Sequence, residues 1–157
     1  WRETVQSMEK NYPNIEVSYE FVDAVAMRLV QWPNSYDVLI TSNLFGDILT
    51  DEASVISGSM GLMPSASVGS KHTLYEPIHG SYPEAAGKNI ANPIASILSL
   101  SMMLDHSFNL KKESEIINNA VEESLKNKYV TPDLSSDKNS FTTDQVGDYI
   151  VDFIKKN

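Results

Sequence analysis

Two aspartates, Asp47 and Asp51, are the residues whose type and spacing most directly suggest chemistry. Four positions apart on a helix, their side chains share one face, with Cβ atoms about 5–6 Å apart. Carboxylate oxygens at that spacing suit a hard divalent cation such as Mg²⁺ or Mn²⁺. Taken alone, such a pair is more commonly an acidic helix start favoured by the helix dipole. The pair therefore leaves a metal site and an acidic helix start both open.

Two further residues bear on that choice. Asp23 stands at the head of the preceding predicted helix, where it also suits the positive end of the dipole. Gly46 directly precedes Asp47, and a glycine inside a helix costs about 1 kcal/mol relative to alanine. This glycine suggests the close approach of another group to the helix.

A loop at residues 76–93 is rich in glycine and polar side chains and carries the imidazole of His79. Such a loop could wrap a polar ligand, although an ordinary connection between two elements is equally compatible with it. Its glycines match neither the G-x-G-x-x-G fingerprint nor the phosphate-binding P-loop. The sequence therefore excludes a Rossmann dinucleotide site of the usual kind.

The charge balance excludes nucleic acid as a partner. Among 157 residues, 21 Asp and Glu outweigh 12 Lys and Arg, which gives a formal charge of −9. The densest basic cluster is the pair Lys111 and Lys112, too small to neutralise a phosphate backbone. With 41% hydrophobic residues, the chain can bury a sizeable core.

Cysteine is absent, which excludes disulfides, thiolate nucleophiles and Cys-ligated metals. No apolar run approaches the roughly 18 residues of a membrane span, and residues 1–20 lack a signal-peptide pattern. We therefore expect a soluble cytoplasmic protein without membrane contact. Because the chain starts at Trp1 inside a helical pattern, we also expect it to be part of a longer protein.

The hydrophobic pattern predicts an α/β protein. Period-two or β-branched segments predict strands at 15–21, 36–41 and 73–78. Helical spacing predicts helices at 1–11, 22–30, 43–57, 93–104, 112–128 and 143–156. The glycine, serine and proline content of residues 58–69 predicts a connecting segment at a structural boundary, and residues 131–140 form a polar connection.

Three long motifs in order carry a family resemblance. Residues 43–53, 58–67, and 74–81 with 86–93, together resemble the isocitrate/isopropylmalate dehydrogenase family of β-decarboxylating enzymes, and the resemblance covers nearly the whole chain. It implies the α/β isopropylmalate dehydrogenase-like fold, which is distinct from the Rossmann fold. Residues 1–57 would end the dimer-forming second domain, and residues 58–157 would return into the first domain.

The resemblance implies NAD-dependent oxidative decarboxylation of a small 2-hydroxy acid. Residues 74–81 favour the branch that converts 3-isopropylmalate to 2-oxoisocaproate (4-methyl-2-oxopentanoate) in leucine biosynthesis. A sibling enzyme acting on homoisocitrate, isocitrate or tartrate/malate is the nearest alternative, and a noncatalytic dimerisation module is another. The family's catalytic Tyr and Lys would lie upstream, so we expect no catalytic residue in this chain and no turnover by it alone.

The same resemblance assigns roles to the acidic residues. Asp47 and Asp51 would bind Mg²⁺ or Mn²⁺ from one subunit, while Asp23 of the other subunit of a homodimer would complete the metal and substrate site. Glu84 would accept hydrogen bonds from the adenosine ribose and repel the 2′-phosphate of NADP. The implied NAD-binding residues are His79, Gly80, Ser81, Tyr82, Pro83, Glu84, Ala86, Gly87, Ala91, Asn92 and Asp133.

Overall fold

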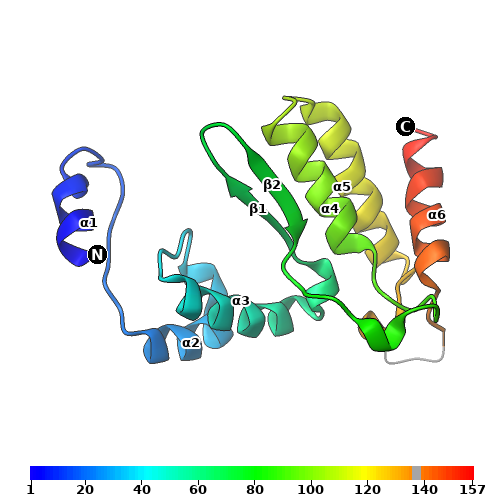
Figure 1. Ribbon diagram of the computed structural model, residues 1–157, viewed down its shortest axis with the longest axis horizontal. Coiled ribbons are helices and arrows are strands. Elements are labelled where there is room, and N and C mark those ends of the chain that lie inside the picture. The colour runs from blue at the N-terminus through cyan, green and yellow to red at the C-terminus, as the bar shows by residue number, and fades with distance from the viewer. Residues whose placement is uncertain (136–138) are drawn as a thin grey trace. The chain divides into compact units, whose positions relative to one another are not determined.

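The computed structural model describes residues 1–135 and 139–157. Contacts divide the chain into two compact units, Trp1–Ala53 and Ser54–Asn157, and each is described by itself below (Figure 1). The assignment of residues 1–57 and 58–157 to two domains of a longer enzyme stays a prediction. No described helix combines the length and the apolar character that crossing a bilayer requires.

The first unit is built from helices joined by extended segments. It contains α1 (Arg2–Glu9), α2 (Val22–Gln31) and most of α3 (Asn43–Ser57), which confirms the three helices predicted here. Val25 and Leu29 of α2 pack with Leu49 of α3 in a small core. Helix α2 ends at Gln31, ahead of the 3₁₀ turn η1 (Pro33–Ser35), because proline cannot continue the hydrogen-bond ladder.

Two predicted strands are wrong as strands. Neither 15–21 nor 36–41 pairs with a strand anywhere in the described part of the chain. Their apolar side chains are exposed, with 62% of Ile15, 79% of Val38 and 70% of Ile40 accessible. A strand is defined by a neighbour that satisfies its backbone, and the described residues supply none. A sequence pattern within one segment does not provide the neighbouring strand that the segment needs.

After the last residues of α3, the second unit continues with a 3₁₀ turn and a β-hairpin. After η2 (Met60–Leu62), strand β1 (Pro64–Val68) pairs antiparallel with β2 (Thr73–Pro77), with Ala66 opposite Tyr75. The predicted strand at 73–78 is confirmed. The connecting segment predicted at 58–69 is wrong over β1, because a paired neighbour overrides the weak strand propensity of proline and serine. A Cβ on Gly69 would meet the His72 carbonyl oxygen at 2.7 Å, so the hairpin turn requires glycine there.

Three helices complete the second unit: α4 (Ile94–His106), α5 (Lys111–Lys126) and α6 (Thr143–Ile154). All three helices were predicted from the sequence and are confirmed. The 3₁₀ turn η4 (Pro132–Leu134) lies in the polar connection predicted at 131–140. Residues 136–138 of that connection fall outside the described part of the chain. The hairpin lies beside α4, which lies beside α5 (Figure 1). The core of this unit consists of Ile94, Ala120, Val121, Val146 and Ile150.

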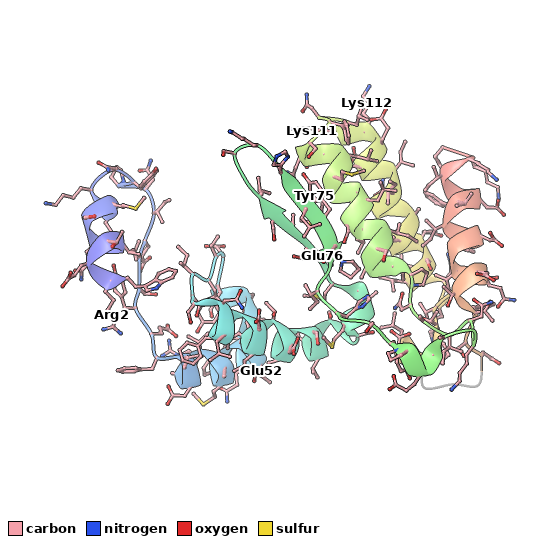
Figure 2. The ribbon with its side chains drawn as sticks, viewed as in Figure 1. Arg2, Glu52, Tyr75, Glu76, Lys111 and Lys112 are labelled. Carbon is pink, nitrogen blue, oxygen red and sulfur yellow. The ribbon has the colours of Figure 1, made fainter. Side chains whose placement is uncertain are left out.

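Hydrogen bonds between polar side chains also connect the hairpin with α4 and α4 with α5. Tyr75 of β2 reaches the end of α4, where its hydroxyl lies 2.8 Å from Ser107 Oγ, whereas its neighbour Glu76 is exposed (Figure 2). The hydroxyl of Ser101, only 2% exposed, lies 2.8 Å from Ser114 Oγ across the α4–α5 contact. Small residues let these two helices approach closely while their hydroxyl groups stay hydrogen-bonded.

Candidate functional site

The aspartate pair lies on one exposed face of α3. Asp47 and Asp51 are one helical turn apart, as predicted, while Leu49 between them points the opposite way into the small core. Asn43 Nδ2 donates to Asp47 Oδ2 over 2.9 Å. Because the core contact of Leu49 sets the rotation of the helix, it presents both carboxylates on the outer face.

The close approach expected at Gly46 comes from within the chain. A Cβ at this position would lie 3.3 Å from Cγ2 of Thr41, which is tighter than ordinary van der Waals contact. The glycine therefore lets the segment before α3 pass close to the first turn of the helix. This contact accounts for Gly46 without a ligand.

Asp23 is not brought together with the aspartate pair within this chain. It is exposed in the first turn of α2, and its Oδ1 accepts a hydrogen bond of 2.9 Å from the Ala24 amide. Among the described residues, no group of three His, Asp or Glu side chains could hold a metal ion. Mg²⁺ usually takes about six oxygen ligands, so the exposed pair fits part of a coordination shell and needs ligands from elsewhere.

The candidate NAD loop runs from β2 to α4 and carries one short 3₁₀ turn, η3 (Pro83–Ala85). Ala85 is 7% exposed and anchors that turn, while Glu84 beside it is exposed. His79 Nδ1 lies 3.0 Å from the carbonyl oxygen of Gly80. Gly87 has φ +74°, a left-handed conformation that favours glycine. The loop thus exposes Ser81, Tyr82 and Glu84 of its predicted ligand-binding residues, while His79 is half-buried.

The far end of the loop is fastened to the start of α6. Asn89 Nδ2 donates to Asp144 Oδ2 over 2.9 Å, and the Asp144 amide donates back to Asn89 Oδ1 over 3.2 Å. Thr143 Oγ1 donates to the carbonyl oxygen of Ala91 over 2.6 Å. Asn89 has φ +56°, which asparagine tolerates better than most residues. Asn89 is outside the predicted ligand-binding set, and its role here is to hold the loop.

Two residues of the predicted set, Asn92 and Asp133, are brought into contact. Asn92 Nδ2 donates to Asp133 Oδ2 over 3.0 Å, and Thr131 Oγ1 donates to Asp133 Oδ1 over 2.5 Å. Ser59 Oγ also donates to Asp133 Oδ2. Partial burial raises the pKa of Asp133, but the hydrogen bonds from Ser59, Thr131 and Asn92 outweigh it and hold that pKa below its ordinary value. The carboxylate is therefore kept ionised.

Sequence reasoning missed Ser59 and Thr131. Ser59 lies in the connecting segment predicted at 58–69, and Thr131 is the first residue of the polar connection predicted at 131–140. Each is a common residue type in an ordinary turn, with no spacing that links it to Asp133. The only local signal is at Ser59, whose Oγ accepts the Gly61 amide at the start of η2, as serine often does before a helical turn.

Similarity to known proteins extends along nearly the whole chain. The sequence profile described as isocitrate/isopropylmalate dehydrogenase matches residues 1–150. The chain belongs to this family. Membership confirms the resemblance carried by the three motifs and the α/β class inferred from the sequence.

Curated relatives of the family are about 50% identical to this chain over the aligned residues. The 3-isopropylmalate dehydrogenase of Aquifex aeolicus is 53% identical over 137 residues, which cover 87% of this chain and 38% of the relative. That of Buchnera aphidicola subsp. Diuraphis noxia is 50% identical over 158 residues, covering 100% of this chain and 44% of the relative. The chain thus spans less than half the length of these relatives.

Solved structures of the family have the same fold. Isocitrate dehydrogenase from Methylococcus capsulatus superposes with a TM-score of 0.93 and 39% identity, over 98% of this chain and 45% of that one. A β-decarboxylating dehydrogenase from Thermococcus kodakarensis superposes with a TM-score of 0.84 and 37% identity, over 99% of this chain and 45% of that one. The isopropylmalate dehydrogenase-like fold predicted from the motifs is therefore confirmed.

Proposed function

We propose that the full-length protein containing these residues is an NAD-dependent 3-isopropylmalate dehydrogenase. The observation that carries the proposal is the 50% identity, over the whole chain, to a protein of that name. The reaction removes a hydride from the hydroxyl-bearing carbon of 3-isopropylmalate and then releases CO₂ to leave 2-oxoisocaproate. This chemistry is a step of leucine biosynthesis, and we propose the cytoplasm as its location, with which the absence of cysteine from residues 1–157 is compatible.

Asp47 and Asp51 are proposed to hold the metal from one subunit. A bound Mg²⁺ or Mn²⁺ would polarise the substrate hydroxyl and stabilise negative charge as CO₂ leaves. Both carboxylates are exposed on the same face of α3, and the amide of Asn43 orients Asp47. Their acceptor oxygens suit a hard cation, and the face they occupy leaves room for substrate and further ligands.

The partner subunit's Asp23 is proposed to complete the site in a homodimer. Asp23 is not grouped with the other two aspartates among the described residues, which is the arrangement expected if it serves a different copy. Helices α2 and α3 also expose large apolar side chains, which favours association. These side chains are Met27, Val30, Leu44, Phe45 and Ile48.

The loop between β2 and α4, together with Asn92 and Asp133, is proposed to bind NAD. Its backbone carries glycines at two positions, Gly80 and Gly87, that leave open space beside a flat ligand. Glu84 is exposed and acidic, which suits ribose hydroxyl groups and opposes the 2′-phosphate of NADP. The cofactor, when bound, accepts the hydride, while these residues hold its adenosine portion.

A sibling activity is the second candidate, because the superposed structure from Methylococcus capsulatus carries the name isocitrate dehydrogenase. The experiment compares NADH formation by the purified full-length protein on 3-isopropylmalate, isocitrate, homoisocitrate and tartrate in the presence of Mn²⁺. We expect 3-isopropylmalate to give the highest kcat/KM. Turnover of another acid alone would reassign the substrate, and no turnover of any would refute the proposed activity.

Residues 1–157 by themselves are proposed to lack turnover. The exposed apolar side chains of segments 15–21 and 36–41 need a covering partner, so we also expect this chain to aggregate when prepared alone. A light-scattering measurement of the isolated chain tests this directly. A monodisperse sample with a cooperative melting transition would contradict it.

A further inference from the structure

A network of hydrogen bonds centred on Asp133 joins three segments that are distant in sequence. We use the name Asp133 network for Ser59, Gly61, Asn92, Thr131 and Asp133. Ser59 and Gly61 belong to the turn before β1, Asn92 directly precedes Pro93 and α4, and the other two lie between α5 and α6. Only Asn92 and Asp133 are in the proposed NAD site.

Ser59 acts in this network as both donor and acceptor. Its Oγ accepts a hydrogen bond of 3.0 Å from the Gly61 amide, which fixes the oxygen in place, and donates to Asp133 Oδ2. A serine hydroxyl carries one proton, so the Gly61 contact directs that proton towards the carboxylate. Asp133 Oδ2 thereby has Ser59 on one side and the Asn92 amide on the other.

Gly61 contributes by lacking a side chain. A Cβ at this position would lie 2.6 Å from Cβ of Asn92, 2.9 Å from its Cγ and 3.0 Å from its Nδ2. Since the two shorter distances lie below those of real Cβ contacts, alanine at position 61 would displace Asn92. The φ of Gly61 lies outside the left-handed region, so the requirement for glycine here is one of space alone.

The carboxamide of Asn92 is consequently oriented at both ends. Nδ2 donates to Asp133 over 3.0 Å, while Oδ1 accepts the amide of Ile94 in the first turn of α4 over 3.0 Å. A flipped amide would place Nδ2 against the Ile94 amide and lose both hydrogen bonds. In the observed orientation one N–H of Nδ2 and one lone pair of Oδ1 remain for a ligand.

We propose that Ser59 and Gly61 are positioning residues for dinucleotide binding, because they fix the orientation of the Asn92 carboxamide through Asp133 and through the space left by the missing Cβ. This inference rests on the proposed function, since it takes Asn92 as part of the NAD site. It assigns a role in cofactor binding to the turn before β1, through the contacts of Ser59 and Gly61 with Asp133 and Asn92. Binding free energy is gained because Asn92 and Asp133 need no reorganisation when the ligand arrives.

The experiment measures NADH affinity by calorimetry in the full-length protein with Ser59→Ala, Ser59→Thr and Gly61→Ala. Loss of a hydrogen bond to a charged group predicts a Kd raised roughly 5- to 20-fold for Ser59→Ala. Ser59→Thr retains the hydroxyl and should restore most of the affinity. Gly61→Ala should weaken NADH binding at least as much, and Ser59→Ala is the milder variant that keeps the experiment decisive if Gly61→Ala unfolds.

Two matched controls separate positioning from general destabilisation. Ser67→Ala changes an exposed serine of β1, and Gly147→Ala adds a Cβ at a helical glycine with nothing within 4 Å. Both should keep the wild-type Kd for NADH. The positioning role also predicts a raised KM for NAD with kcat at saturating NAD within about 2-fold of wild type, because the Asp133 network is proposed to act on the adenosine portion of the cofactor, which takes no part in hydride transfer.

The outcomes distinguish this inference from the proposed function. If the wild-type protein binds no NADH, the proposed NAD site fails and this inference fails with it. If wild type binds NADH and the Ser59→Ala and Gly61→Ala proteins bind it equally well, only the positioning role is refuted. A shifted Asn92 side-chain amide signal in the NMR spectrum of both variants, accompanied by weaker binding, supports it.

Discussion

Asn92 donates a hydrogen bond from Nδ2 to Oδ2 of Asp133, although the two residues are 41 positions apart. Asn92 precedes α4 and Asp133 follows α5, so this contact joins the two segments that flank the packed pair of helices. It also joins a loop residue and a turn residue that are both proposed to meet the adenosine portion of NAD. A substitution that breaks this contact should therefore lower both the stability of the second unit and the affinity for NAD.

Replacement of Asp133 by asparagine should change how stability depends on pH. The folded-state pKa of Asp133 lies below its ordinary value of 3.8, so its ionised form stabilises the fold. That contribution is complete above the ordinary pKa and disappears as pH falls through the lowered one. Asp133→Asn should melt at a lower temperature at neutral pH, and the difference from wild type should shrink on acidification.

The measurement is the melting temperature of the full-length protein between about pH 7 and pH 3, the range over which carboxylates protonate. Asp148→Asn is the control, because Asp148 is an exposed acid of α6. Its curve should run parallel to that of wild type. A constant gap between Asp133→Asn and wild type over the whole range would mean that the Asp133 charge does not contribute.

Replacement of Asp47 by asparagine should abolish metal-dependent turnover while nearly preserving the fold. The change removes a ligand charge at constant shape on an exposed helix face. We expect kcat/KM on 3-isopropylmalate to fall more than about 100-fold, since loss of a direct ligand should exceed the effect of losing an outer-shell partner. Asp37→Asn, at an exposed aspartate outside the helices, should retain activity. If the Asp47→Asn protein depends on Mn²⁺ as the wild type does, Asp47 is not a metal ligand.

Replacement of Glu84 by lysine should shift cofactor preference towards NADP. The exposed carboxylate is lost and a cation appears where the 2′-phosphate is proposed to lie. We expect the NADP/NAD ratio of kcat/KM to rise by roughly 10-fold or more, because one repulsion is exchanged for an attraction. Glu115→Lys makes the same charge change on the exposed side of α5 and should leave the ratio unaltered. If Glu84→Lys and Glu115→Lys have the same NADP/NAD ratio of kcat/KM, Glu84 does not determine cofactor preference.

Substitutions at Asn89 should separate hydrogen bonding from backbone strain. Asn89→Gly retains access to φ +56° but loses both hydrogen bonds with Asp144, which should cost about 1–2 kcal/mol of unfolding free energy. Asn89→Ala loses the same bonds and adds about 1 kcal/mol or more for the left-handed backbone. Urea unfolding should therefore rank Asn above Gly and Gly above Ala. Alanine more stable than glycine would show that the backbone relaxes.

The sequence alone predicted all the α-helices of the described chain. Helices follow from interactions three and four positions apart, so the apolar spacing within α2, α4 and α5, for example, contained the required information. The aspartate pair of α3 was predictable for the same reason, since Asp47 and Asp51 share a face by helical geometry alone. The motifs further predicted the family.

Apart from β2, which the sequence predicted, only the tertiary structure decided which segments form strands and which residues form the Asp133 network. The alternating pattern at 15–21 and the β-branched pattern at 36–41 form no strand here, whereas the proline- and serine-rich segment of β1 does. Strand formation depends on a partner that satisfies the backbone, and a network depends on which turns meet in space. Ser59, Asn92 and Asp133 come from three separate turns, so their relationship arises from the packing of the hairpin and helices that carry them.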